Sequence, residues 1–369
     1  MAVELALHVQ RKFAVGNDAS TYLFDLAGNT AGTVIAASAS NHSIKIYSAT
    51  DLSILAELKG HKERISGIKF SSRNDDILYS CSMDGAFCQW SISSGKRVIL
   101  YNAGKNLPLT SFDVNCTETL ACLGTEFIDH EAKLLFIDLT TAGSGRLVAT
   151  YDNVHNDDIT CIHFHPITPT ALLSGSTDGT VSHIDLSSAP DSNEDDCLLL
   201  TLNTESSVAS IGFFGPVSQY IYATTHIESL YVWEINEGTQ LVQLNDVRQT
   251  TRNSPIPVQI DYIVDVVYHA SSQRLFLVAG TFDGNIVMLH INRDSLDLVA
   301  TMPKAHNEMV RCSFWNTGVD HVFTGDEDAV LCKWGPPLPP APVDSNPEAD
   351  HKIKTVTDSR GAQKRVAPY

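Results

Sequence analysis

The sequence has no apolar run near the roughly 20 residues that a membrane-spanning helix requires. Its first residues, MAVELALHVQRKF, interleave polar side chains where a secretory signal peptide has a continuous apolar stretch. We therefore expect no membrane span and no secretion. The sequence predicts an intracellular protein of the nucleus, the cytoplasm or both.

No CxxC pair occurs among the eight cysteines, and most of them lie inside short apolar runs. A disulfide framework is therefore not expected, and the cysteines are interpreted as small buried side chains in a reducing compartment. The sequence also lacks a GxxxxGK[ST] loop and a GxGxxG segment that opens a helix. No nucleotide site and no other cofactor is predicted.

Basic residues are scarce, since 25 Lys and Arg stand against 43 Asp and Glu and give a net charge of −18. Nucleic-acid binding depends on a basic surface, so no direct nucleic-acid partner is expected. Residues 335–369 hold five basic and four acidic side chains, so the excess of negative charge belongs to residues 1–334. An acidic body fits either simple solubility or a basic protein partner.

Helical periodicity is nearly absent. Short runs rich in Val, Ile, Leu, Tyr, Phe and Thr alternate instead with turn residues, which is typical of many short strands. The clearest unit, residues 60–103, contains four such runs, and Asp84-Gly85 gives a hairpin signal between the second and the third. Similar units occupy residues 156–203 and 261–306.

The end of the third run marks each repeat. It falls at Tyr47, Trp90, Ile137, Ile184, Trp233, Leu289 and Trp334. The spacings, from 43 to 56 residues, are close to the propeller period of roughly 40–45 residues. The sequence therefore predicts an all-β fold, a seven-bladed β-propeller with four-stranded antiparallel blades, over residues 1–335.

The two ends of the propeller are predicted to meet. After Trp334 the chain continues as GPPLPPAP, and because proline cannot continue a central strand, blade seven lacks its fourth strand. The strand-like segment 3–15 precedes blade one and is predicted to complete blade seven, which closes the ring and removes an open edge. The Pro-rich residues 336–369 are predicted to form a disordered tail.

These features resemble the WD-repeat family, in which a His, a Ser or Thr, an Asp and a Trp form a hydrogen-bonded tetrad in a blade. The resemblance covers about residues 3–335 and implies two complete tetrads and a partial one. Their members are His61, Ser80, Asp84 and Trp90 in blade two, His306, Thr324, Asp328 and Trp334 in blade seven, and His155, Ser174 and Asp178 in blade four, where Ile184 replaces Trp.

The tetrads share residue types with catalytic triads. They recur with a Trp at the blade period, however, which a unique active site would not do, so a structural network explains them. His163 and His165 point to one side of a strand, as zinc-binding pairs do, but no third ligand stands at a fitting spacing. We therefore predict no catalytic residue and no metal site.

The resemblance also implies a loop-built face, called the top face, formed by the loops before the first strand and after the second strand of each blade. Most of its residues are acidic and one is basic: Glu63, Arg64, Met83, Glu126, Asp129, Glu131, Asp157, Asp158, Asp261, Tyr262, Phe282, Glu308, Met309, Asp326 and Glu327. The methionines and aromatic residues would add apolar contacts. These are either ordinary polar loops or a negatively charged funnel that binds a basic protein in a salt-sensitive manner.

The sequence thus predicts a non-enzymatic protein-interaction scaffold, a monomeric propeller within a complex. The favoured role is an acidic escort or assembly platform for basic proteins such as ribosomal proteins or histones. One alternative is a substrate receptor of a cullin-type ubiquitin ligase, although the Arg that such receptors often carry is absent after Trp90, Trp233 and Trp334. The other alternative is a propeller enzyme. Two insertions, 187–196 and 248–259, fit either tolerated loop length or, for the second, a partner contact or lid.

Overall fold

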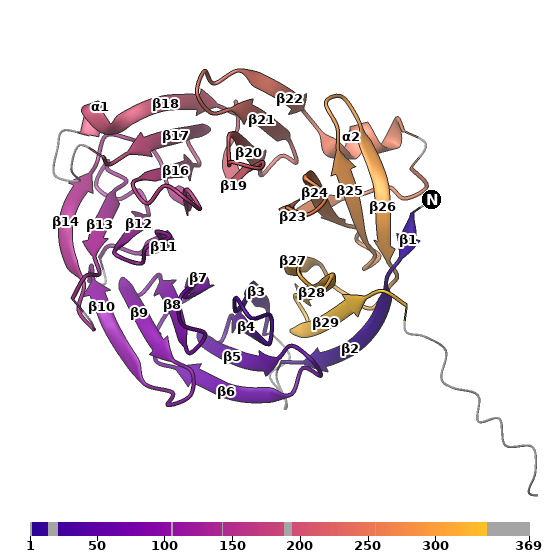
Figure 1. Ribbon diagram of the computed structural model, residues 1–369, viewed down its shortest axis with the longest axis horizontal. Coiled ribbons are helices and arrows are strands. Elements are labelled where there is room, and N and C mark those ends of the chain that lie inside the picture. The colour runs from indigo at the N-terminus through magenta and orange to yellow at the C-terminus, as the bar shows by residue number, and fades with distance from the viewer. Residues whose placement is uncertain are drawn as a thin grey trace, which may run out of the picture. The chain divides into compact units, whose positions relative to one another are not determined.

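The computed structural model describes residues 2–13, 21–104, 106–141, 143–187, 194–254 and 256–337. These residues form seven small sheets arranged as blades around a central axis (Figure 1). Neighbouring strands within each blade are antiparallel and follow one another outward from the axis. The prediction of an all-β, seven-bladed propeller is confirmed.

The first four blades use consecutive strands. They are β3 (Leu23–Gly28), β4 (Val34–Ala39), β5 (Ser43–Ser48) and β6 (Ile54–Lys59) in blade one, β7 (Ile65–Phe70), β8 (Ile77–Ser82), β9 (Ala86–Ser91) and β10 (Arg97–Asn102) in blade two, β11 (Leu109–Val114), β12 (Leu120–Thr125), β13 (Leu134–Asp138) and β14 (Arg146–Tyr151) in blade three, and β15 (Ile159–Phe164), β16 (Ala171–Ser176), β17 (Thr180–Asp185) and β18 (Leu198–Asn203) in blade four.

The last three blades complete the ring. They contain β19 (Val208–Phe214), β20 (Tyr220–Thr225), β21 (Leu230–Glu234) and β22 (Gln240–Leu244) in blade five, β23 (Tyr262–His269), β24 (Arg274–Gly280), β25 (Ile286–Ile291) and β26 (Leu296–Met302) in blade six, and β27 (Val310–Asn316), β28 (His321–Asp326) and β29 (Val330–Gly335) in blade seven.

The strand β2 (Ala6–Lys12) supplies the fourth strand of blade seven. It pairs antiparallel with β29, from Ala6 opposite Gly335 to Lys12 opposite Val330, so the predicted closure is confirmed. One part of that prediction is wrong, because β1 (Val3–Glu4) pairs parallel with β26 of blade six instead. The N-terminal segment thus joins two blades, and residues 14 and 15 of the predicted strand lie outside the described residues.

The apolar core is divided among the interfaces between blades. Seven clusters of buried side chains occur, one for each pair of neighbouring blades, including the pair of blades seven and one. Second strands such as β16 are buried along their whole length because both faces of the sheet are covered, whereas the outermost strands alternate between exposed and buried residues. Each blade is therefore stabilised by its two neighbours rather than by a core of its own.

Each of the two insertions contributes a short helix. The helix α2 (Val247–Arg252) begins at Asp246, whose side chain accepts the N–H of Arg248, and it buries Val247. After α2, Ile256 and Val258 are partly buried against the core between blades five and six, so the described part of the 248–259 insertion covers an interface. The helix α1 (Glu194–Cys197) closes the other insertion, of which residues 188–193 lie outside the described residues.

Residues 338–369, which hold most of the predicted tail, are also outside the described residues. Over the part of the chain that is described, no helix is long and apolar enough to cross a membrane.

Candidate functional site

The tetrad residues of blade two meet in the structure. His61 Nε2 lies 2.7 Å from Ser80 Oγ, and His61 Nδ1 lies 3.1 Å from a carboxylate oxygen of Asp84. Trp90 Nε1 donates to the same Ser80 hydroxyl over 2.8 Å. The Asp84 carboxylate also accepts the N–H groups of Lys62 and Ala86. Burial opposes the shift, but the hydrogen bond with His61 and these two backbone bonds hold the pKa of Asp84 well below the usual range.

Blade seven corrects one residue of its predicted tetrad. His306 Nδ1 lies 2.7 Å from Asp326, not from Asp328, while His306 Nε2 and Trp334 Nε1 both reach Thr324 Oγ1 over 2.8 Å. Asp326 stands at the end of strand β28 and also accepts the N–H groups of Asp328 and Val330. A carboxylate at this position thus binds the histidine and caps the turn, which leaves the side chain of Asp328 outside the network.

Blade four has a partial network. His155 Nε2 lies 2.7 Å from Ser174 Oγ, and His155 Nδ1 lies 3.0 Å from Thr180 Oγ1 and 3.4 Å from Asp178. All three networks tie a loop to the second and third strands of its own blade. They account for the buried histidines as architecture.

A recurrent backbone hydrogen bond defines the inner edge of the top face. In six blades, the residue after the second strand donates its N–H to the carbonyl oxygen of the residue before the first strand. The pairs are Ser40 and Tyr22, Met83 and Arg64, Glu126 and Pro108, Thr177 and Asp158, His226 and Ser207, and Glu327 and Met309, at 2.9–3.2 Å. In blade six the Asp261 side chain accepts the N–H of Phe282 instead. These pairs are called the top rim below.

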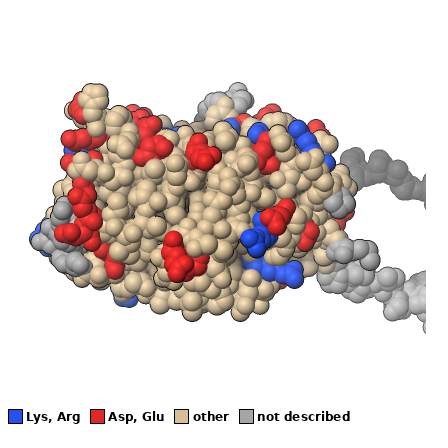
Figure 2. Space-filling model, turned by 90° about the horizontal axis from the view of Figure 1, so that it is seen from above, with Lys and Arg blue, Asp and Glu red and all other residues tan. Residues whose placement is uncertain are grey.

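Charge on the top rim is mainly negative, with Glu126, Asp158, Asp261 and Glu327 against Arg64. On the edge of the disc that Figure 2 shows, patches of Asp and Glu outnumber those of Lys and Arg within a largely uncharged surface. Two predicted top-face acids have a basic partner, since Glu131 pairs with Lys133 at 2.6 Å and Glu327 pairs with Arg311.

The other predicted top-face acids on the surface form no direct ion pair with Lys or Arg within the described residues. Asp158 accepts the N–H of Phe127 at 2.7 Å, and Asp157 accepts the N–H of Asp158 at 2.9 Å. Four side chains make no hydrogen bond or ion pair within the described residues: Glu63, Glu126, Asp129 and Glu308. We call these four the free carboxylates.

Two predicted surface residues prove to be buried. Asp326 belongs to the tetrad network described above and is completely buried. Tyr262 is 6% exposed, and its hydroxyl accepts the N–H of Val310 from the neighbouring blade. Of the predicted apolar contact residues, Phe282 is 66% exposed and Met83 and Met309 are half-buried, whereas Tyr262 is not accessible at the surface.

The central channel holds carboxylates that the sequence analysis missed. A cavity of about 340 Å³ lies among the innermost strands, and its lining includes Asp25, Cys161 and Ser210, each placed just after a bulge in its strand. Asp25 accepts the N–H of Ile68 at 2.9 Å. On β23, Asp265 accepts the hydroxyl of Ser313 at 3.0 Å. Burial raises the pKa of Asp25 and of Asp265 to about 6.

Replacing Asp25 or Asp265 with Asn should raise the free energy of unfolding by about 1–2 kcal/mol at pH 7.5 and by much less at pH 4. When a carboxyl group has a higher pKa in the folded than in the unfolded protein, the folded protein becomes less stable as the pH rises from about 4 to about 6, because the group must then ionise in a buried position. Asn avoids that cost and keeps an oxygen acceptor. Urea unfolding at the two pH values measures the difference, and a gain that does not depend on pH contradicts this explanation.

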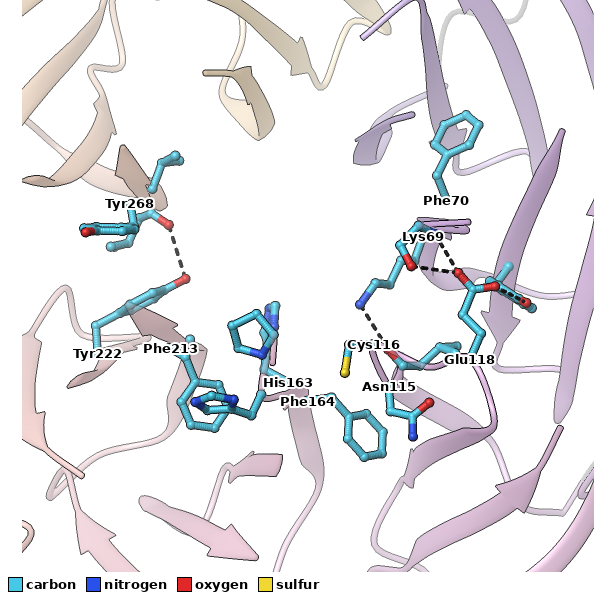
Figure 3. Close-up of a pocket in the computed structure, with 18 residues that line it drawn as sticks. Lys69, Phe70, Asn115, Cys116, Glu118, His163, Phe164, Phe213, Tyr222 and Tyr268 are labelled. Carbon is cyan, nitrogen blue, oxygen red and sulfur yellow. Dashed lines mark hydrogen bonds between the residues drawn. The ribbon is translucent and has the colours of Figure 1, made fainter. Parts of the chain in front are cut away.

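The opposite mouth of the channel is a second cavity, of about 450 Å³, that we call the lower mouth (Figure 3). It is lined at the far ends of the innermost strands by Lys69, Cys116, His163, Phe213, Tyr222 and Tyr268, among others. These residues come from blades two to six and span some 200 positions, so no local pattern predicted their meeting. The one signal in the sequence that could have indicated this mouth is the lack of charged residues in the turns 165–170, 215–219 and 270–273.

The two candidate metal ligands line this mouth without forming a metal site. His165 Nδ1 accepts the backbone N–H groups of Ile167 and Thr168, at 3.2 and 2.9 Å, so it is already engaged. His163 Nδ1 lies 3.8 Å from Asp113. Across the described residues, no group of three or more His, Cys, Asp or Glu side chains is arranged to hold a metal ion.

Comparison with known proteins agrees with this architecture. The family model "WD domain, G-beta repeat" matches residues 52–91 and 145–185. Each match covers the outermost strand of one blade and three strands of the next, and the two matches include the networks of blades two and four. WD-repeat propellers are in general interaction scaffolds that carry no catalytic site of their own.

Four stretches of the sequence, 111–127, 155–166, 245–269 and 311–334, indicate a narrower resemblance to WD repeat-containing protein 89. The comparison confirms it. The chain is 27% identical to the WD repeat-containing protein 89 homolog of Dictyostelium discoideum over 365 residues, which cover 96% of this chain and 94% of the relative. It is also 29% identical to WD repeat-containing protein GTS1 of Arabidopsis thaliana, over 88% of this chain and 85% of that protein.

An uncharacterized WD repeat-containing protein of Schizosaccharomyces pombe is 24% identical, over 86% of this chain and 96% of its own length. Together with the seven blades and the His–Ser/Thr–Trp networks, these similarities lead to one conclusion: the chain is a seven-bladed β-propeller that contains WD repeats and is similar over most of its length to the WD repeat-containing protein 89 homolog.

Proposed function

We propose that the top rim and the free carboxylates bind a basic segment of a protein partner, and that the propeller serves as an escort or assembly platform for basic proteins such as ribosomal proteins or histones. The observation that carries this proposal is that Glu63, Glu126, Asp129 and Glu308 form no ion pair within the described residues, although Asp129 lies in the field of Lys133, which is itself paired with Glu131. A WD-repeat propeller is consistent with a protein-interaction scaffold in general.

The energetics favour a basic partner over a neutral one. Glu63, Asp129 and Glu308 are exposed, so a Lys or Arg that approaches them loses little hydration and gains roughly 0.2–1 kcal/mol at each site. Several such contacts on one rigid face add up, and they also accelerate encounter with a cationic partner. The exposed ring of Phe282 and the half-buried Met83 and Met309 add apolar contacts beside the charges.

The fold suits this role because the face is built before the partner arrives. The recurrent N–H to carbonyl bonds of the top rim fix the loops of six blades at 2.9–3.2 Å, so little loop ordering opposes binding. A basic protein that is prone to wrong contacts with nucleic acid would be shielded by such a face. The proposal places the protein where such clients are made or assembled, in the nucleus, the cytoplasm or both.

The test neutralises the free carboxylates together, as Glu63→Gln, Glu126→Gln, Asp129→Asn and Glu308→Gln. The probe is a fluorescent dodecapeptide with the sequence Lys-Gly-Ser-Arg repeated three times, and its affinity is measured by fluorescence polarisation at 50 and 150 mM salt. Four contacts of about 0.5 kcal/mol each predict a roughly 30-fold weaker affinity at low salt. The wild-type affinity should also fall between the two salt concentrations.

A matched control changes the same number of charges elsewhere. Asp75→Asn, Asp195→Asn, Glu237→Gln and Asp294→Asn neutralise four exposed carboxylates outside the top rim. This variant has the same net charge as the first, so it should bind the peptide within about threefold of the wild type. Equal weakening in both variants would mean that net charge alone attracts the peptide, and the proposed site would then be wrong.

A further inference from the structure

We propose that the lower mouth is a second protein-binding site, which accepts one aromatic or long aliphatic side chain carried on an uncharged segment of a partner. It lies at the far end of the channel from the top rim and does not depend on the acidic face (Figure 3). At about 450 Å³, it has the size of a cavity that takes a bulky anchor residue with part of its backbone.

Aromatic rings form one wall of the lower mouth. Phe213 stacks edge-on against His165, with ring centroids 4.8 Å apart. Tyr222 donates its hydroxyl to the carbonyl oxygen of Val266 at 3.2 Å, which leaves its ring toward the cavity (Figure 3). Rings held in this way offer a firm apolar surface, and they favour an apolar side chain that loses contact with water on entering.

Charged groups in the mouth are already engaged by the protein. Glu118 accepts hydrogen bonds from the Ser71 hydroxyl, the Ser72 N–H and the Tyr79 hydroxyl at 2.7–3.2 Å. Lys69, on the same side of the cavity as Glu118 (Figure 3), forms an ion pair with Asp113. Because Glu118 is already saturated with hydrogen bonds and Lys69 already has an anionic partner, neither group needs an oppositely charged residue from outside, which favours an uncharged partner segment.

Three of the turns around the mouth are uncharged, which is unusual in a chain with a net charge of −18. Residues 165–170, 215–219 and 270–273, which belong to three consecutive blades, contain no Asp, Glu, Lys or Arg. Two of these turns present apolar side chains to solvent, since Ile167 and Val217 are each 66% exposed. An apolar pair beside an aromatic cavity is the arrangement of a contact surface rather than of a solvated loop.

Both apolar tips are held in place by hydrogen bonds. The backbone N–H of Ile167 donates to His165 Nδ1, and the Ile167 carbonyl accepts the Cys116 thiol at 3.5 Å. In the other turn, the N–H of Ser218 donates to Gly215, and Ser218 has a positive φ of 58°, which a non-glycine residue adopts at a cost. The hydrogen bond and the fixed backbone conformation hold Val217 in an exposed position, so little ordering of this turn would oppose the binding of a partner.

The test selects peptides from a random dodecapeptide phage library on the full-length protein, with counter-selection on the variant Ile167→Ser/Val217→Ser. Selected peptides are synthesised, and their affinities are measured by fluorescence polarisation for the wild type, this variant and Phe213→Ala. A matched control is Ile227→Ser, which removes a 55% exposed isoleucine from a loop of the opposite face. Thermal melting of each variant shows whether it remains folded.

The expected peptides contain Trp, Phe, Leu or Met flanked by uncharged residues. Their affinity should fall at least tenfold in Ile167→Ser/Val217→Ser and in Phe213→Ala, should not change in Ile227→Ser, and should be insensitive to salt. Peptides that need Lys, Arg, Asp or Glu for binding, or a selection without any peptide that depends on Ile167 and Val217, would overturn the proposal. Neither result affects the proposed function of the top rim, which is tested by a basic peptide and different variants.

Discussion

Deletion of residues 2–12 is expected to lower the melting temperature by about 10 °C or more and to broaden the unfolding transition. Six residues of β2 stand in register with β29, and Val9 packs against the core between blades seven and one. Loss of about six strand pairs at roughly 1 kcal/mol each removes about 6 kcal/mol and leaves β29 as an open edge. Differential scanning calorimetry measures the shift, and light scattering follows association through that edge.

Two further experiments separate ring closure from simple truncation. Deletion of residues 2–5 removes only β1, which pairs at two positions with blade six, so it should cost a small part of the effect. A synthetic peptide of residues 2–13, added to the protein that lacks residues 2–12, should restore the melting temperature in a concentration-dependent manner. If a scrambled peptide rescues equally well, strand pairing is not the cause.

Replacement of Asp326 by Ala is expected to destabilise the protein by about 3–5 kcal/mol, whereas Asp328→Ala should cost less than about 1 kcal/mol. Asp326 and His306 are both completely buried, so removal of the carboxylate leaves an unpaired imidazole N–H and two unpaired backbone N–H groups. Asp328 contributes only its backbone to the same turn. Urea unfolding of the two variants measures the difference directly.

The double variant Asp326→Ala/His306→Leu provides the check on this explanation. If the cost of Asp326→Ala arises from an unpaired His306, replacing both partners with apolar residues should recover part of the lost stability. If the double variant loses more stability than the two single variants added together, the unpaired His306 does not explain the cost of Asp326→Ala. Similar losses of stability in Asp326→Ala and Asp328→Ala would instead support Asp328 as a member of the tetrad, as its spacing from Thr324 predicts.

The choice between Asp326 and Asp328 shows what residue spacing cannot predict about the tetrad of blade seven. In blade two the Asp stands four residues after Ser80, and the same count after Thr324 leads to Asp328. Blade seven, however, has a carboxylate where blade two has Ser82, and this side chain reaches both the histidine and the turn. Two acids two residues apart satisfy the same pattern, and only the positions of the atoms distinguish them.

The free carboxylates and the buried Tyr262 illustrate the same limit on the top face. Sequence position placed these residues in the correct loops, because each loop follows directly from the strands beside it. Which acids already have a partner, such as Glu327 with Arg311, depends on side chains from other loops. Tyr262 was expected to be a contact, yet the N–H of Val310, 48 residues away, holds its hydroxyl inside the structure.

The sequence by itself determined the number of blades, the four-stranded pattern of the clearest blades, and the residues of blade two that join His61 to Trp90, because all of these follow from a repeat whose contacts lie within about 50 residues. The tertiary structure alone decided that β1 joins blade six, that Asp326 replaces Asp328, and that residues from five blades meet at the lower mouth. The physical reason is ring closure. It brings together the ends of strands that are far apart in the chain, and no local pattern of residues encodes which side chains then face each other.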